Sequence, residues 1–293
     1  MAKYSLWKIA LSFKVFLLTI LSILSYPSFA QNKLKEKVAW KERIYYRIFR
    51  NPTFLDSVQH LDLSLQQLYN LDTLIKHCKQ LRTLNISDNN IRQLVSLPYD
   101  SKLQALWAQN NLINHFDPFI CNLNHLQELN LANNKLSYLP ECLCNLQNLR
   151  ILNLSHNPLE QLCSCFPGYA PLISIELANC QLRSVPNLLF CNPKLEKLNL
   201  SGNFLQSLPD TTAPLPALKE LNLSRNYLQQ VPSIIRRLVH LQVLNLSYNK
   251  LIDFSALVKL PQLKVVILKG NPLITKSQKK EIRSKLPGVK IIF

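Results

Sequence analysis

Eight cysteines and six histidines are the side chains of this 293-residue chain best suited to redox or metal chemistry. Two cysteine pairs, Cys142-x-Cys144 and Cys163-x-Cys165, have a single residue between the thiols. Zinc sites usually leave about two to four residues between paired ligands, because one ion needs its sulfurs at tetrahedral corners. The histidines are scattered, and none belongs to an H-E-x-x-H motif. We therefore expect no metal centre and no cofactor.

Signatures of enzyme active sites are also missing from the sequence. No G-x-S-x-G nucleophile motif occurs, and neither of the common Gly-rich phosphate-binding motifs is present. The whole chain has only four glycines. We therefore expect a protein that is not an enzyme and has no catalytic residues.

The first thirty residues have the layout of a secretory signal peptide. Three lysines precede the mostly apolar run from Val15 to Ser25, and small residues at Ser28 and Ala30 suit a signal peptidase. We expect cleavage after Ala30 and a secreted, periplasmic or cell-surface protein. The alternative is an uncleaved anchor helix, although the run falls short of the ~20 residues that span a bilayer. After cleavage, we expect no transmembrane segment.

From Val58 onward the sequence repeats with a period of 22 or 23 residues. Each copy fits L-x-x-L-x-L-x-x-N-x-L, with other aliphatic residues at some places. Positions in a repeat are numbered from its first residue. The ten copies begin at Val58, Leu81, Leu103, Leu126, Leu149, Leu172, Leu195, Leu218, Leu241 and Leu263. One copy cannot enclose its own leucines, so neighbouring copies must stack around a shared core.

This pattern resembles the leucine-rich repeat family, and the resemblance covers the chain from about Val58 to its end. The second half of the repeat, as in Leu139–Leu146 and Val231–Leu238, fits the LPxxIxxLxxL form of the 23-residue subclass. The absence of disulfide-flanked caps favours a bacterial exported member. The resemblance implies an α/β fold, a curved leucine-rich repeat solenoid with a parallel sheet inside the curve and short helices or turns outside. We expect a signal peptide at 1–30, an N-terminal cap helix at 31–57, ten repeats at 58–285 and a C-terminal capping strand at 286–293.

Elementary strand geometry supports the same arrangement. Alternation places positions 4 and 6 in the core and positions 3, 5 and 7 outside. Position 9 is Asn in eight of the ten repeats, where an inward amide can bind backbone groups of the turn that leaves the strand. Gln66 and Cys180 are the two exceptions. We also expect a final helix over Lys276–Lys285.

The cysteines separate by their place in the repeat. Cys78 and Cys180 take core positions, and Cys163 and Cys191 have no partner at an equivalent position. The pairs Cys121–Cys144 and Cys142–Cys165 are each one repeat apart, so a disulfide is an option for either pair. The outer side of a horseshoe is splayed, and bridging fails beyond ~7 Å between Cα atoms. We expect free, partly buried thiols, with the two disulfides as the alternative.

The outward residues of the inner sheet are the expected binding surface. Against a small, polar background stand larger side chains of the types that anchor interfaces. The candidate partner-binding residues are Trp107, Asn110, Asn133, His156, Phe204, Arg225, Tyr227 and Tyr248. We expect one protein ligand to contact Trp107 and the cluster around Phe204 and Tyr248. The alternatives are adhesion to a glycan or an anionic envelope polymer, and a consensus surface with no specific partner.

The net charge of +17 does not change this expectation. The leader, residues 31–50 and residues 264–293 hold most of the excess, with three, five and seven net positive charges, while residues 51–263 are close to neutral at +2. No basic stripe with interleaved aromatic residues runs along the expected sheet. We therefore expect no nucleic-acid partner.

Overall fold

The computed structural model describes residues 54–71, 75, 77–94, 97, 101–164, 166, 170–210, 215–258, 260–272 and 275–293. The chain divides into two compact units, Met1–Phe54 and Leu55–Phe293. The expected signal peptide and the expected cap helix up to residue 53 lie outside the described residues. Helix α3 spans Phe54–Ser57 and leads into the repeats of the second unit.

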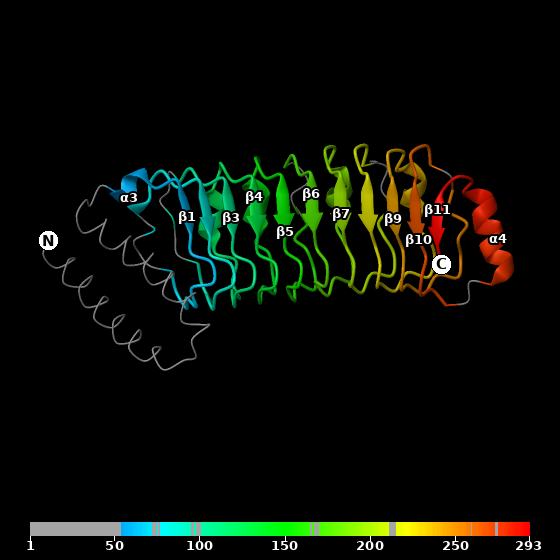
Figure 1. Ribbon diagram of the computed structural model, residues 1–293, viewed down its shortest axis with the longest axis horizontal. Helices are drawn as coiled ribbons and strands as arrows, with labels where there is room; N and C mark the ends of the chain where they lie inside the picture. Colours follow the sequence, from blue (N-terminus) through cyan, green and yellow to red (C-terminus); the bar gives the residue numbers. More distant parts are fainter. Residues whose placement is uncertain are drawn as a thin grey trace, which may run out of the picture. The chain divides into compact units, whose positions relative to one another are not determined.

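Eleven strands form one parallel sheet, in which each strand pairs with the next along the chain (Figure 1). The strands are β1 (His60–Asp62), β2 (Thr83–Asn85), β3 (Ala105–Trp107), β4 (Glu128–Asn130), β5 (Ile151–Asn153), β6 (Ser174–Glu176), β7 (Lys197–Asn199), β8 (Glu220–Asn222), β9 (Val243–Asn245), β10 (Val265–Ile267) and β11 (Lys290–Ile292). In the ten repeats the strand covers positions 3 to 5. Equivalent positions pair across neighbours, as with Leu84 and Leu106. The expected leucine-rich repeat solenoid is confirmed.

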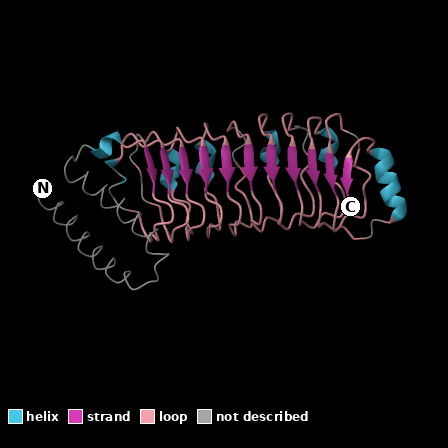
Figure 2. Cartoon of the chain, viewed as in Figure 1, coloured by secondary structure: helices cyan, strands magenta, loops and turns pink. Residues whose placement is uncertain are grey.

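The core lies directly behind this sheet. Leu152 at position 4 and Leu154 at position 6 are fully buried, and the same positions are buried in most other repeats. The 3-10 helices η2 (Pro118–Asn122), η3 (Glu141–Asn145), η4 (Asn187–Cys191) and η5 (Ser233–Arg237) run behind the strands (Figure 2). A proline at the N-cap precedes η3, η4 and η5, since that position needs no donated N–H and suits extended backbone.

The asparagine at position 9 ties each turn to its neighbour. Asn157 is 1% exposed, and its Nδ2 donates to the carbonyl oxygens of Leu131 (2.9 Å) and Leu154 (2.8 Å). Its Oδ1 accepts the Leu136 amide at 3.0 Å. The same pattern recurs at Asn89, Asn111, Asn134, Asn203, Asn226, Asn249 and Asn271. One buried amide therefore satisfies backbone groups of two consecutive repeats.

At Cys180 this ladder is interrupted. The Cys180 thiol donates to the Leu154 carbonyl at 3.3 Å, but a thiol offers no carbonyl oxygen to the preceding turn. The Leu159 amide instead bonds to the Asn157 carbonyl within its own turn, at 2.9 Å. Glu160 then takes a left-handed conformation with φ 57°.

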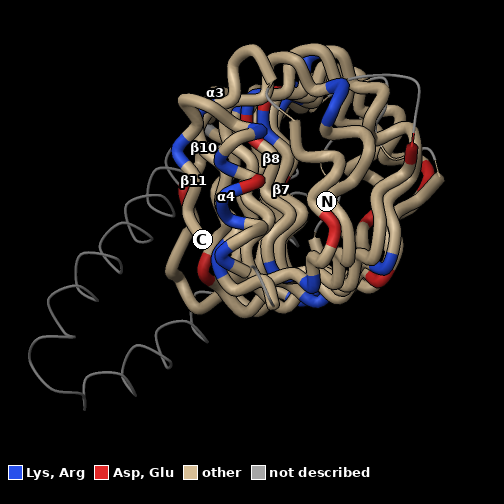
Figure 3. The backbone as a smooth tube through the Cα atoms, turned by 90° about the vertical axis from the view of Figure 1, so that its right-hand side faces the viewer, with Lys and Arg blue, Asp and Glu red and all other residues tan. Residues whose placement is uncertain are grey.

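The C-terminal end of the sheet is covered by α4, Lys276–Lys285, followed by β11. Thr275 and Gln278 form a capping box at the start of α4. Ile282 and Leu286 are buried. Figure 3 looks onto this end of the chain and shows the Lys and Arg residues along α4.

The expectation of free thiols is wrong for Cys121 and Cys142, which form a disulfide with 5.5 Å between their Cα atoms. Both in-phase pairings are also wrong, because each would use one of these two bonded cysteines. Cys121 lies near the end of η2, whereas Cys142 lies at the start of η3. A diagonal pair turns its thiols toward each other, while in-phase residues project in parallel. Cys144 is disulfide-bonded as well, whereas Cys78, Cys163, Cys180 and Cys191 form no disulfide.

Candidate functional site

The charged side chains of β6, β7 and β8 have partners within the inner sheet. Glu176 accepts a hydrogen bond from Asn199 at 2.7 Å, and Lys197 pairs with Glu220 at 2.9 Å. On the neighbouring row, Lys219 and Glu196 lie 2.8 Å apart. The asparagines at position 5 bind their own turns, as Asn153 Oδ1 does with the Ser155 amide at 3.0 Å. This surface is therefore largely self-satisfied.

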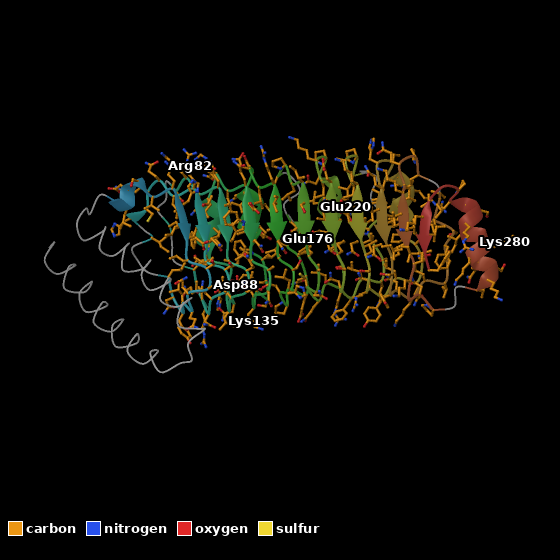
Figure 4. The ribbon with its side chains drawn as sticks, viewed as in Figure 1. Arg82, Asp88, Lys135, Glu176, Glu220 and Lys280 are labelled. Carbon is orange, nitrogen blue, oxygen red and sulfur yellow. A yellow bond between two sulfur atoms is a disulfide. The ribbon has the colours of Figure 1, made fainter. Side chains whose placement is uncertain are left out.

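The edge below the strands is formed by positions 8 to 12, where the chain leaves the sheet. Figure 4 labels Asp88 at position 8 and Lys135 at position 10, and both lie below the strands, away from Glu176 and Glu220 on the sheet. We call this edge the turn edge. Position 8 has a positive φ in all ten repeats, at Leu65, Asp88, Asn110, Asn133, His156, Asn179, Gly202, Arg225, Tyr248 and Gly270.

Left-handed backbone explains most residue types at position 8. Gly, Asn and Asp adopt it at the lowest cost, and they fill six of the ten places. The side chains of Asn110 and Asn133 also join a ladder. Asn110 Nδ2 donates to Asp88 Oδ1 at 2.7 Å, and Asn133 Nδ2 donates to Asn110 Oδ1 at 2.8 Å. These two predicted binding residues therefore have a conformational role in the turn.

Larger residues at position 8 are held in the same conformation. His156, Arg225 and Tyr248 have φ values of 60°, 55° and 54°. A bulky side chain is disfavoured in this region by contact with its own backbone, so each departure costs stability. All three side chains are exposed. An exposed residue that lowers stability and adds nothing to the core is a candidate for function.

Arg225 and Tyr248 lie together at the turn edge. The Arg225 guanidinium carbon is 5.2 Å from the centre of the Tyr248 ring. The ring in turn lies over Gly270, where an added Cβ would approach ring carbons to 2.5 Å. Gly270 therefore leaves the space that the tyrosine ring occupies, and three consecutive repeats shape this contact.

A second row of contacts runs alongside, at positions 10 and 12. The rings of Phe204 and Tyr227 are 5.9 Å apart and tilted by 43°. Arg183 lies 5.9 Å from the Phe204 ring centre, and the Lys250 ammonium lies 4.5 Å from that of Tyr227. The cation–aromatic strip, our name for both rows, consists of Arg183, Phe204, Arg225, Tyr227, Tyr248 and Lys250.

The structure thus brings together four of the predicted residues and leaves others apart. Trp107 is half-buried on β3, and Tyr248 follows β9, six strand steps away or about 29 Å at ~4.8 Å per step. His156 lies near Asn179, with 3.4 Å between side-chain nitrogens, and not in the strip. Arg183 and Lys250 were missed by the sequence reasoning. Each lies about one repeat from a predicted aromatic residue, Arg183 from Phe204 and Lys250 from Tyr227, and this spacing would have indicated them.

Metal and thiol chemistry find little support in the described part of the chain. No group of three His, Cys, Asp or Glu residues there is arranged to hold a metal ion. Burial raises the pKa of the Cys180 thiol to about 11 and that of Cys78 to about 11. Buried, protonated thiols of this kind are poor nucleophiles.

This arrangement defines a class of protein, the solenoid of stacked repeats around one parallel sheet. Three family models then match parts of the chain. The repeat region of leucine-rich repeat and WD repeat-containing protein 1 matches residues 192–292, and two general leucine-rich repeat models match residues 101–159 and 77–92. The chain is a leucine-rich repeat protein. The comparison with curated proteins gives no match.

Solved structures share the fold at low sequence identity. A leucine-rich repeat protein of Leptospira interrogans is 23% identical, with a TM-score of 0.56, over 85% of this chain and 98% of that one. The functional domain of InlJ from Listeria monocytogenes, described as including a cysteine ladder, is 20% identical, with a TM-score of 0.55, over 81% of this chain and 54% of that one. A chain from the octameric complex of latrophilin 3, Unc5D and FLRT2 is 21% identical, with a TM-score of 0.61, over 80% and 83%.

These likenesses establish the fold. Leucine-rich repeat folds commonly serve as protein–protein interaction modules and are typically not enzymes. Among the described helices, none has the length and apolar character needed to cross a bilayer.

Proposed function

We propose that this protein is a non-enzymatic interaction module that presents its concave sheet and turn edge to a protein partner outside the cytoplasm. The observation that carries the proposal is the contact between Arg225 and Tyr248, two exposed residues in a backbone conformation that disfavours them. Arg and Tyr are frequent anchors of protein interfaces. Nothing in the core requires either side chain at these places.

The sheet suits this role because its backbone is already ordered. Strand and turn amides bond to carbonyl groups of the next repeat, as Tyr248 does with Lys269 at 2.7 Å and Arg225 with Ser247 at 2.8 Å. A partner that docks on this surface loses little free energy to ordering the binding site.

Two observations support export. Residues 1–30 have the composition of a signal peptide, and the Cys121–Cys142 disulfide suits an oxidising compartment. The neighbouring structures from Leptospira and Listeria fit a bacterial exported protein. Mass spectrometry of the native protein tests the leader: the mature N-terminus should be Gln31, and a protein that begins at Met1 would contradict cleavage.

Affinity capture tests the interaction. Immobilised residues 31–293 should retain a protein from native envelope extract, and the partner should bind directly when purified. The Arg225→Asn/Tyr248→Asn double variant should lose this binding, whereas Trp107→Ala tests whether the contact extends to β3. Partner binding that survives all three substitutions would refute the proposed surface.

A further inference from the structure

The charged side chains of the strip are all positive. Positions 8 to 12 of the four repeats from Asn179 to Ile252 contain Arg183, Arg225 and Lys250 and no Asp or Glu. The ion pairs formed by the described residues involve other cations. On the sheet, by contrast, carboxylates and cations occur together. The strip therefore has no carboxylate of its own to pair with its three cations.

The rings of the strip are already partly covered. Arg183 lies over Phe204, Lys250 over Tyr227 and Arg225 over Tyr248. A sugar ring stacks on an open aromatic face, and here a cation occupies one face of each ring. The cations, by contrast, keep N–H donors: contact with a ring uses the face of a guanidinium and leaves its edge, and the Lys250 ammonium has three N–H groups. The arrangement favours carboxylates that approach from the edge over a stacked glycan.

We propose that the cation–aromatic strip is the docking site for an acidic segment of a protein partner, with carboxylates on the three cations and apolar side chains between the exposed rings. This inference rests on the proposed function and names the partner's chemistry. The strip extends over three repeat steps, about 15 Å at ~4.8 Å per step. An extended chain covers that length with about five residues at ~3.3 Å each.

The left-handed places supply variants that remove the strip without disturbing the fold. Asn stands at position 8 in three other repeats, at Asn110, Asn133 and Asn179. Arg225→Asn and Tyr248→Asn therefore replace disfavoured residues with one that this turn accepts. Arg183→Gln and Lys250→Gln remove charge at exposed positions. Arg150→Gln and Lys264→Gln, exposed cations away from the strip, are the matched controls.

The experiment uses residues 31–293 and displayed random decapeptides as the probe. Selected peptides should carry two or more Asp or Glu residues within about five positions, alternating with apolar residues. A synthetic selected peptide should bind with an affinity that falls as salt rises. The Arg225→Asn/Tyr248→Asn and Arg183→Gln/Lys250→Gln double variants should each lose about thirtyfold in affinity, as expected for interface anchors. The control variants should bind like the parent.

Oligogalacturonate is the second probe, because it carries carboxylates on a sugar chain. Binding of this polymer through the strip, at an affinity equal to that of the best acidic peptide, would overturn the proposal in favour of a glycan. Selection of neutral or basic peptides would also overturn it. If a captured protein depends on Trp107 and not on the strip, this inference fails while the proposed function stands. If no protein binds anywhere on the sheet or turn edge, both fail.

Discussion

Replacing Asn157 by Ala removes one of the position 9 amides that tie consecutive turns together. The substitution leaves the buried Leu136 amide without its partner. It also removes one donor each from the carbonyl groups of Leu131 and Leu154, which keep the Asn134 side-chain amide and the Cys180 thiol. A buried polar group left unsatisfied costs about 1–3 kcal/mol, and each hydrogen bond lost by a carbonyl group that keeps another donor costs about 0.5–1.5 kcal/mol. Partial relaxation of the turn lowers the sum, so we expect a loss of about 3 kcal/mol in the free energy of unfolding.

The turn at Cys180 shows how such a turn relaxes when the asparagine is absent. At Cys180, which stands in the same place one repeat later, the orphaned Leu159 amide turns to the Asn157 carbonyl. The Cys180 thiol lies 3.3 Å from the Leu154 carbonyl oxygen and 3.6 Å from that of Ala178. Asn157→Cys should therefore lose less than Asn157→Ala, because a thiol donates one weak hydrogen bond and an alanine donates none.

Chemical denaturation followed by circular dichroism measures the loss, and hydrogen exchange at the Leu136 amide locates it. Both are needed because neighbouring repeats can unfold separately. Asn148→Ala is the matched control, since Asn148 is exposed and its side chain donates to the Asn124 carbonyl at 2.7 Å. We expect that control to lose about 1 kcal/mol or less. Equal losses for Asn157→Ala and Asn148→Ala would refute the ladder as a source of stability.

Three further outcomes are expected. Tyr248→Asn should leave the midpoint of thermal unfolding unchanged or raise it, because relief of left-handed strain, about 1 kcal/mol, offsets the lost ring contact; a clear fall would contradict the strain argument. Cys142→Ser, which opens the 21-residue loop to Cys121, should lower the free energy of unfolding by about 3 kcal/mol, as measured with urea against the parent in oxidising buffer. The buried Cys180 thiol has its pKa raised from 9.0 to about 11, so the unfolded chain releases this proton first and stability falls as pH rises from 9 to 11. Cys180→Ala should reduce the loss at pH 10 by about 1 kcal/mol, and Cys78, whose pKa is also raised to about 11, should account for part of the loss that remains; an unchanged loss in Cys180→Ala would contradict the burial of this thiol.

The sequence predicts the fold well because its signal is periodic. Positions 4 and 6 lie in the core, as with Leu152 and Leu154, and α4 lies at the residues expected for the final helix. Position 9 could be assigned from one repeat and applied to the others, because stacking places equivalent residues in equivalent surroundings. At Cys180 the same logic indicates an altered turn, although not which hydrogen bonds replace the lost ones.

The disulfide shows where reasoning from periodicity fails. Equivalence across repeats predicts which residues lie side by side, but a covalent bond also needs two side chains that point toward each other. Cys121 near the end of η2 and Cys142 at the start of η3 meet this condition through a diagonal offset of 21 residues. The period of 23 residues contains no information on that offset, so the sequence favoured the wrong partners.

The candidate site departs from the sequence prediction for a related reason. The sequence analysis includes position 8 in the expected binding surface, but only the backbone shows that every residue there is left-handed. This one fact divides the predicted residues. Asn110 and Asn133 satisfy the conformation and bind each other, so the turn alone explains them. Arg225 and Tyr248 oppose the conformation, so the turn does not explain them.

In a repeat protein, an unusual residue can be recognised by comparison, because nine other copies show which residue types the fold prefers at each position. Where the copies agree, the residue serves the stack. Where Arg225 and Tyr248 replace the Asn or Gly of other repeats, stability is lost in exchange for exposed charge and ring area at adjacent places. Gly270, which makes room for the Tyr248 ring, ties a third repeat to the same choice. Substituting it with Ala should displace the ring and weaken binding without removing either anchor, and unchanged binding in a folded Gly270→Ala variant would separate the Arg225–Tyr248 contact from function.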